Sequence, residues 1–207
     1  MPNPWLTVPL ADYEGHMGPE GVHQLEALAS LFARALSFAK PASVAVLGVA
    51  GGNGLDRVDP AITRRLVALD INLQYLDAVR TRYARLNPEL HLIDLAAAPL
   101  PIPPVDLVHA ALIFEHAGTG RCLDNALSLV KPHGRLSVVL QLPSDSAPEV
   151  SPSRYPSIAT LRYDFHLIPP AELRALVEPH GFTLELEEGA SVPFGKSLWL
   201  GVFVSQA

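Results

Sequence analysis

Short, valine-rich apolar runs alternate with segments of helical spacing along the middle of the chain. Such runs are typical of strands buried on both faces of a parallel sheet. We expect five strands of this kind, at residues 43–49, 64–71, 90–95, 105–112 and 135–142. Residues 72–86 and 121–130 have the apolar spacing of helices. This alternation predicts a parallel sheet with helices on both faces.

The two ends of the chain have other patterns. Residues 1–18 contain several Pro and Gly residues and are expected to form an irregular arm, followed by a helix over residues 19–38. Residues 143–165 are rich in Ser and Pro, and a loop of that length is usually a lid or a disordered segment. A last helix, with Gly181 just beyond its end, and two closing strands are expected at 169–180, 183–188 and 197–205. The connection between these strands is too short for a helical crossover, so they are expected to be antiparallel.

Composition narrows the class of protein. The chain has 207 residues, of which 49% are hydrophobic, and a net charge of −6. These values predict a globular domain, and the scattered basic residues give little support for a nucleic-acid partner. Cys122 is the one cysteine, which suits a reducing cytoplasm. No apolar stretch is long enough to cross a membrane, and the N-terminus does not resemble a secretory signal.

The candidate chemistry begins at "GVAGGNG", residues 48–54, where the first strand is expected to turn into a helix. Glycines there would let the backbone approach a ligand beyond the carboxyl end of the strand. Asp70 ends the second strand about twenty residues later, where a carboxylate can accept hydrogen bonds from ribose hydroxyls. The alternatives are a plain tight turn and a helix cap. At this point NAD and S-adenosylmethionine fit equally well.

Other positions separate the two cofactors. Position 50 is alanine, so no G-x-G-x-x-G begins at Gly48. No Tyr-x-x-x-Lys pair follows either, because Tyr155 and Tyr163 are followed at that spacing by alanine and leucine. A short-chain dehydrogenase is therefore disfavoured. Asp94 ends the third strand, where a carboxylate can accept from an adenine amino group or simply cap a turn.

Six segments resemble, in order, motifs of class I S-adenosylmethionine-dependent methyltransferases of the small-molecule type, similar to methyltransferase type 11. They are "VLGVAGGNGL", "LVALDIN", "LIDLAAAPLP", "VDLVHAALIFEHAG", "VKPHGRLSVVL" and "ELRALVEPHGF". The resemblance implies a cofactor site made of Gly48, Ala50, Gly52, Asp70, Ile71, Asp94, Leu95 and Ala111. It departs from the family at Val46, where an acid is common, and at Ala50, which replaces the middle glycine.

The resemblance implies one domain over residues 1–207, with a Rossmann-like, doubly wound, seven-stranded α/β sheet that is mostly parallel with an antiparallel last strand. Residues 1–40 and a lid-like insertion at 143–168 are expected to cover the active site. The candidate catalytic residues are His116 and Tyr13, and the candidate substrate-binding residues are His16, Glu115, Tyr155 and Tyr163. For His116, packing at the start of a helix is the simpler alternative. No histidine pair has metal-ligand spacing, so no metal is expected.

The expected function is methyl transfer from S-adenosylmethionine to O, N or C of an unidentified small molecule. A protein that binds S-adenosylmethionine or S-adenosylhomocysteine without chemistry is one alternative, and a nicotinamide-dependent oxidoreductase is another. We expect a cytoplasmic protein without nucleic-acid or membrane partners. The sequence does not distinguish a monomer from a homodimer.

Overall fold

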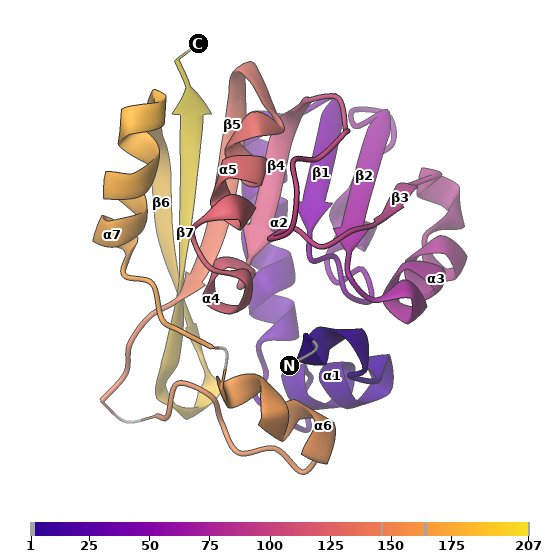
Figure 1. The fold of residues 1–207 in the computed structure, drawn as a ribbon, viewed down its shortest axis with the longest axis vertical. Helices are drawn as coiled ribbons and strands as arrows, with labels where there is room; N and C mark the ends of the chain where they lie inside the picture. Colours follow the sequence, from indigo (N-terminus) through magenta and orange to yellow (C-terminus); the bar gives the residue numbers. More distant parts are fainter. Residues whose placement is uncertain (1–2, 146, 164, 207) are drawn as a thin grey trace.

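Residues 3–145, 147–163 and 165–206 are described by a computed structural model, and within them seven strands form one sheet (Figure 1). The strand order is β3-β2-β1-β4-β5-β7-β6. The strands are β1 (Ser43–Leu47), β2 (Arg65–Asp70), β3 (Glu89–Leu92), β4 (Val105–Ala111), β5 (Val130–Gln141), β6 (Phe182–Val192) and β7 (Lys196–Ser205). The last strand, β7, runs antiparallel to both of its neighbours, and the other pairs are parallel. The predicted Rossmann-like fold is confirmed.

Helices cover both faces of the sheet. One face packs against α2 (Leu25–Ala39) and α3 (Leu73–Arg82). The other packs against α4 (Phe114–Ala117), α5 (Arg121–Ser128) and α7 (Pro170–Val177). Successive residues of a strand point to opposite faces, so all five residues of β1 are buried. This double coverage explains the unbroken apolar runs of the sequence.

The glycine turn after β1 does not lead into an α-helix, contrary to expectation. It continues through turns into a short 3₁₀ helix, η2 (Leu55–Arg57), before β2 begins. Ala50, Gly52 and Gly54 all have positive φ angles, of 47°, 87° and 83°. A right-handed helix cannot pass through such residues. The face that this helix would have covered is instead covered by α2, which precedes β1 in the chain.

The N-terminal arm is more regular than predicted. Its described part contains a 3₁₀ turn, η1 (Pro4–Leu6), and a helix, α1 (Leu10–Met17). Pro4 and Pro9 stand at the first position and the N-cap of these elements, where a missing N–H does no harm. The next helix, α2, accordingly begins at Leu25 and not near residue 19. In the sequence the prolines of this arm indicate irregular structure, but in the fold Pro4 and Pro9 mark the starts of helices.

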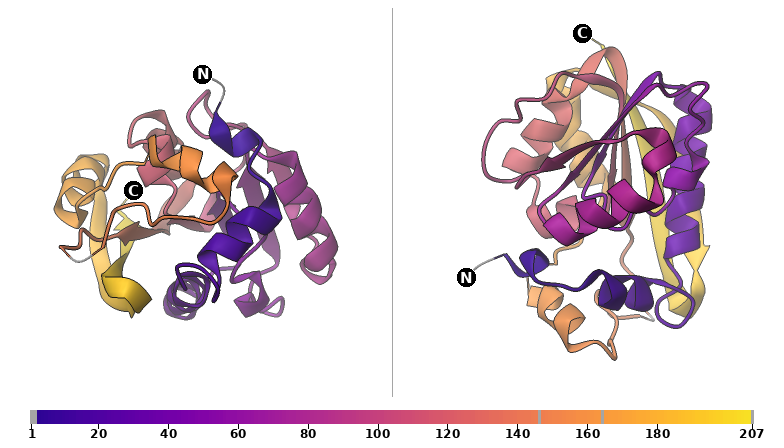
Figure 2. Two further views of the ribbon diagram at one scale, coloured as in Figure 1. Left: turned by 90° about the horizontal axis from the view of Figure 1, so that it is seen from below. Right: turned by 90° about the vertical axis from the view of Figure 1, so that its right-hand side faces the viewer.

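The insertion at 143–168 also contains ordered elements, α6 (Pro156–Ala159) and η4 (Thr160–Tyr163). Asp164, in the same segment, lies outside the described residues. Helices α1 and α6 lie side by side across the carboxyl-end edge of the parallel strands (Figures 1 and 2). Ser157 Oγ of α6 donates a hydrogen bond of 2.6 Å to Asp12 Oδ2 of α1. We refer to α1 and α6 together as the cover.

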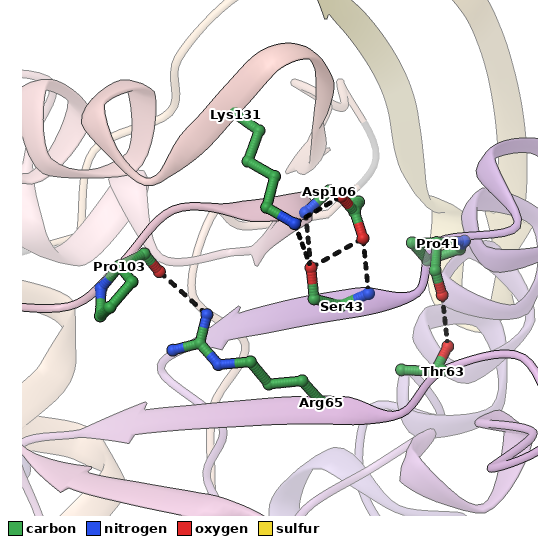
Figure 3. Close-up of polar contacts among 7 residues, drawn as sticks. All are labelled: Pro41, Ser43, Thr63, Arg65, Pro103, Asp106 and Lys131. Carbon is green, nitrogen blue, oxygen red and sulfur yellow. Dashed lines mark hydrogen bonds and ion pairs between the residues drawn. The ribbon is translucent and has the colours of Figure 1, made fainter.

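The opposite edge of the sheet has a polar cluster that fixes the strand starts (Figure 3). Asp106 of β4 accepts hydrogen bonds from the backbone N and the Oγ of Ser43 in β1, both at 2.7 Å. Its other oxygen accepts from Lys131 Nζ of β5 at 2.8 Å. Arg65 of β2 donates to the carbonyl of Pro103 at 3.0 Å. The aspartate of the "VDLV" motif therefore joins three strands and is far from the ligand edge.

Candidate active site

A cavity lies between the carboxyl ends of the parallel strands and the cover. It has about 1160 Å³ of empty space, counting the part that is open to solvent. Its sheet side is lined by Gly48 after β1, Asp70 at the end of β2, Asp94 after β3 and Ala111 at the end of β4. Four neighbouring strands thus contribute to one wall, at the edge where open parallel sheets bind ligands.

The glycine turn has two sides with different neighbours. Gly48 and Ala50 line the cavity, and Gly48 has a φ of +63°. Gly51 faces the cover, because a Cβ there would lie 2.2 Å from Glu14 Oε1 of α1. Gly52 faces α3 and does not line the cavity, because its Cβ would lie 2.4 Å from the Tyr83 ring. Gly51 and Gly52 therefore leave room for neighbouring side chains of the protein and not for a ligand.

Asp70 connects the glycine turn to the second strand. Its Oδ2 accepts a hydrogen bond of 2.9 Å from the backbone N–H of Ala50, and its Oδ1 accepts one of 2.9 Å from Asn72. The side chain of Asn72, not Asp70, caps α3 by accepting from Gln74 N. Burial raises the pKa of Asp70 to about 6, although these backbone N–H groups act in the opposite direction.

Aromatic side chains form the wall facing Asp70. Trp5 lies edge-on to His116, with ring centroids 4.9 Å apart, and Phe165 lies 5.0 Å from His116 on another side. Burial lowers the pKa of His116 to about 4, so its imidazole is neutral near pH 7. Tyr13 of α1 lies near Tyr75 of α3, with ring centroids 6.2 Å apart. Burial, with the negative charge of Asp70, raises the pKa of Tyr13, so its phenol keeps its proton.

Two polar atoms in this wall have no hydrogen-bond partner among the described residues. They are the hydroxyl of Tyr75 and Nδ1 of His116, and both side chains line the cavity. A buried polar atom left unpaired is costly, so native proteins nearly always satisfy it. Neither atom is exposed to the empty cavity. The cavity fits a nucleoside-type ligand by its carboxylates and by the close backbone of the glycine turn.

The far end of the cavity is polar, and of its residues only His16 was predicted from the sequence. It consists of His16, Gln24, Gln141 and Lys196, which come from four different elements or their flanks. One signal was present, because Gln141 ends a parallel strand in the same way as Asp70. Lys196 begins a strand that is otherwise almost wholly apolar. The aromatic residues Trp5, Tyr75 and Phe165 were also missed.

Most of the predicted site residues line this cavity. They are Tyr13, His16, Gly48, Ala50, Asp70, Ile71, Asp94, Leu95, Ala111 and His116. Four others do not line it: Gly52, Glu115, Tyr155 and Tyr163. The structure thus gathers the predicted cofactor residues except Gly52, but only part of the predicted substrate set.

The three misplaced substrate candidates have other surroundings. Glu115 is 1% exposed and lies behind the wall, where its Oε1 accepts from the backbone N–H of Gln141 at 2.9 Å. Tyr155 packs under α1, because a Cβ on Gly15 would lie 2.2 Å from its hydroxyl oxygen. Tyr163 is 70% exposed. Their order in the sequence placed them near the pocket, but the path of the insertion turns both tyrosines away from it.

No three His, Cys, Asp or Glu side chains among the described residues gather closely enough to hold a metal ion. None of the helices in the described ranges has the length and hydropathy needed to cross a bilayer.

Comparison with solved structures shows the fold. The N-methyltransferase NodS from Bradyrhizobium japonicum WM9, in complex with S-adenosylhomocysteine, superposes with a TM-score of 0.73 at 17% identity, covering 99% of this chain and 100% of that chain. Magnesium protoporphyrin IX methyltransferase (ChlM) from Synechocystis PCC 6803, with bound S-adenosylhomocysteine, gives 0.70 at 13% identity, covering 97% and 95%. The [4+2]-cyclase SpnF gives 0.63 at 14% identity, covering 87% and 81%. No curated protein matches the sequence.

Comparison with protein families adds a sequence match to this structural similarity. Residues 46–138 match the family model described as a methyltransferase domain. The matched segment contains the glycine turn, Asp70, Asp94 and the strand end at Ala111, which together make the sheet side of the cavity. The resemblance found in the sequence is thereby confirmed: the segment that makes the sheet side of the cavity matches a methyltransferase domain, and the whole chain has the fold of structures solved with S-adenosylhomocysteine bound.

Proposed function

We propose that the protein transfers a methyl group from S-adenosylmethionine to O, N or C of a small molecule held in the cavity beneath α1 and α6. One observation carries the proposal. The carboxylate of Asp70 is bound to the backbone of Ala50 at 2.9 Å, on a wall that it shares with Gly48, Asp94 and Ala111. A carboxylate beside a close-approach backbone turn is the arrangement that holds an adenosine.

The sheet side of the cavity would hold the cofactor. Asp70 would accept hydrogen bonds from the ribose hydroxyls, and Asp94 and Leu95 would flank the adenine. Gly48, Ala50, Ile71 and Ala111 would line the rest of that half. When bound, the cofactor supplies a sulfonium methyl group that is ready for in-line attack. The chain then has to align the acceptor with that methyl group and exclude water.

The aromatic wall would hold and deprotonate the acceptor. His116 lines the cavity and is neutral near pH 7, so it would be the group that takes a proton as the new bond forms. Tyr13 keeps its proton and would donate a hydrogen bond from its hydroxyl to the acceptor. The cover would close this wall against solvent, which makes the whole of residues 1–207 one functional domain. We place the enzyme in the cytoplasm, on the grounds of its single cysteine.

The first test is a calorimetric titration with S-adenosylmethionine, S-adenosylhomocysteine and NAD. The adenosyl compounds should bind to the wild type, and Asp70→Ala should lose that binding. Binding of NAD alone, or of none of the three, would refute the proposal. Turnover with any acceptor then separates an enzyme from a protein that only binds the cofactor.

The role of His116 needs a separate measurement. His116→Gln should lower kcat by about a hundredfold while the Kd for S-adenosylhomocysteine stays within about twofold, because a general base acts only in the chemical step. An unchanged kcat would leave His116 as a packing residue. A parallel loss of cofactor binding would point to the same conclusion.

A further inference from the structure

Lys196 is a buried cation at the polar end of the cavity. It is 5% exposed and begins β7. Its Nζ donates to Gln141 Oε1 at 3.2 Å and to the backbone carbonyl of Glu149 at 2.8 Å, both of which are neutral acceptors. Within the described ranges no carboxylate forms an ion pair with it, whereas Lys131 is paired with Asp106. A buried charge without a partner is costly unless something compensates it.

The hydrogen bonds around Lys196 leave donors unused. Gln141 Oε1 accepts from both Lys196 and Gln24, and Gln141 Nε2 donates to the carbonyl of Glu149 at 2.8 Å. An ammonium group has three N–H donors and a primary amide has two. One donor is therefore left on each of Lys196, Gln24 and Gln141, and neutral His16 adds one N–H donor, against two acceptors, Gln24 Oε1 and the other ring nitrogen of His16. This end of the cavity has an excess of donors and one positive charge.

The charge acts on its surroundings in the cavity. Burial lowers the pKa of Lys196 from its ordinary value. Burial, and then the positive charge of Lys196, lowers the pKa of His16, which keeps His16 neutral and leaves Lys196 as the cation of this end. No arginine lines the cavity in the part of the chain that the structure describes. The charge to be matched is therefore a single one.

We propose that Lys196, Gln24 and Gln141 form an anion-binding subsite for the methyl acceptor, and that the acceptor is a small molecule bearing a carboxylate. This inference rests on the proposed function, because it needs an acceptor in the same cavity as the cofactor. A carboxylate has two oxygens for the three free donors and one charge for the one lysine. A phosphate usually recruits arginine or several cations, which this end of the cavity lacks.

The position of the subsite suits an acceptor and not the adenosine. Asp70 ends β2, and Gln141 ends β5, three strands farther along the sheet order. A second hollow, on the outside of α1 and the insertion, shares His16, Val22 and Ser151 with the main cavity. Arg154 and Glu20 both line that hollow and form an ion pair with each other, so the hollow carries no net charge from them. The shared residues mark a route by which a small molecule could enter on the Lys196 side.

The test uses matched pairs of probes with the protein saturated by S-adenosylhomocysteine. Acetate, benzoate, phenylacetate and 4-hydroxybenzoate are titrated beside the corresponding amides. At least one carboxylate should bind about tenfold more tightly than its amide, since one charge-assisted hydrogen bond is removed. Lys196→Gln should abolish this preference, and Lys40→Gln, which neutralises an exposed lysine, should retain it.

Three outcomes would overturn the inference. The first is a wild type that prefers none of the four carboxylates. The second is an undiminished preference in Lys196→Gln. The third is a loss of affinity for S-adenosylhomocysteine itself in that variant, which would mean that Lys196 holds the methionine carboxylate of the cofactor.

A folding readout guards against a purely structural effect. Lys196→Met should raise the Tm of the free protein, because it removes an unpaired buried cation. A clear fall in Tm would instead mean that Lys196 stabilises the fold through its hydrogen bond to the carbonyl of Glu149. That result would count against the subsite. Should the wild type bind no S-adenosylhomocysteine, the proposed function fails. The carboxylate titration on the protein alone still decides whether Lys196 binds anions.

Discussion

Arg82 of α3 holds Glu14 of α1 and the glycine turn at the same time. Its guanidinium donates to both carboxylate oxygens of Glu14, at 3.1 Å for the Nη2–Oε2 contact, and to the carbonyl of Gly51 at 3.2 Å. Gly51 has no side chain in the space that Glu14 fills. The cover is therefore fastened directly to the turn that lines the proposed cofactor site.

Glu14→Gln should loosen this fastening and speed the release of S-adenosylhomocysteine. Both partners are partly exposed, so the pair is worth only about 0.2–1 kcal/mol, which corresponds to an increase in release rate of up to about fivefold. Stopped-flow measurement of Trp5 fluorescence in the cavity would follow the release. Glu26→Gln breaks a similar exposed pair, with Arg57, away from the cavity, and should leave the rate unchanged. Equal rates in all three proteins would show that the ion pair does not restrain the cover.

The affinity for S-adenosylhomocysteine should depend on pH through Asp70. Its carboxyl has a pKa of about 6 in the folded protein, and in the proposed site the ribose hydroxyls would donate to the ionised form. Affinity should be constant above about pH 6 and weaken by up to about tenfold for each pH unit below it. Calorimetry between about pH 5 and pH 7.5 would measure this. Asp70→Asn should bind weakly throughout and without this pH dependence; a wild type with a flat profile would contradict the assignment.

Ala50→Gly should stabilise the protein. Ala50 has a φ of +47°, a left-handed conformation that costs an L-residue about 1–2 kcal/mol and costs glycine little. The extra freedom of glycine in the unfolded chain offsets part of this, so the free energy of unfolding should rise by about 0.5–1 kcal/mol. Urea denaturation would measure the change. Ala33→Gly, inside α2, should lower the same quantity by about 1 kcal/mol, and a decrease in both variants would refute the argument.

Glu115→Gln should stabilise the protein above neutral pH. Burial raises the pKa of Glu115 from 4.5 to about 7, and its Oε2 has no partner among the described residues. The folded state therefore binds a proton more readily than the unfolded state, so wild-type stability falls as pH rises from about 4.5 to 7. The amide has no charge to bury, and its oxygen can still accept from Gln141 N. The gain in Tm should be larger at about pH 8 than at about pH 5.

Thermal melts at those two pH values would check the prediction, with Glu172→Gln as the control. Glu172 is exposed on α7, so its substitution should have little effect at either pH. A gain in Glu115→Gln that does not depend on pH would mean that packing, and not charge burial, is responsible.

The sequence by itself determined the buried strands of the sheet, the methyltransferase resemblance and the strand ends that form the proposed cofactor wall. β1, β2 and β4 were predictable because a strand buried on both faces is apolar at most of its positions. Asp70 and Asp94 were predictable because the carboxyl ends of parallel strands meet at one edge, so a polar residue at a strand end is a candidate without any tertiary information. These signals are local in the chain.

Only the tertiary structure decided the cover and the acceptor half of the cavity. Trp5, Phe165 and Lys196 reach one cavity from the two ends of the chain. Lys196 and Gln24 both contact Gln141, although they are separated from it by 55 and 117 residues along the sequence. Both contacts depend on the insertion of β7 between β5 and β6 and on the packing of α2 beside them. No period or spacing in the sequence records these distances, because they are set by how whole elements pack and not by which residues are neighbours in the chain.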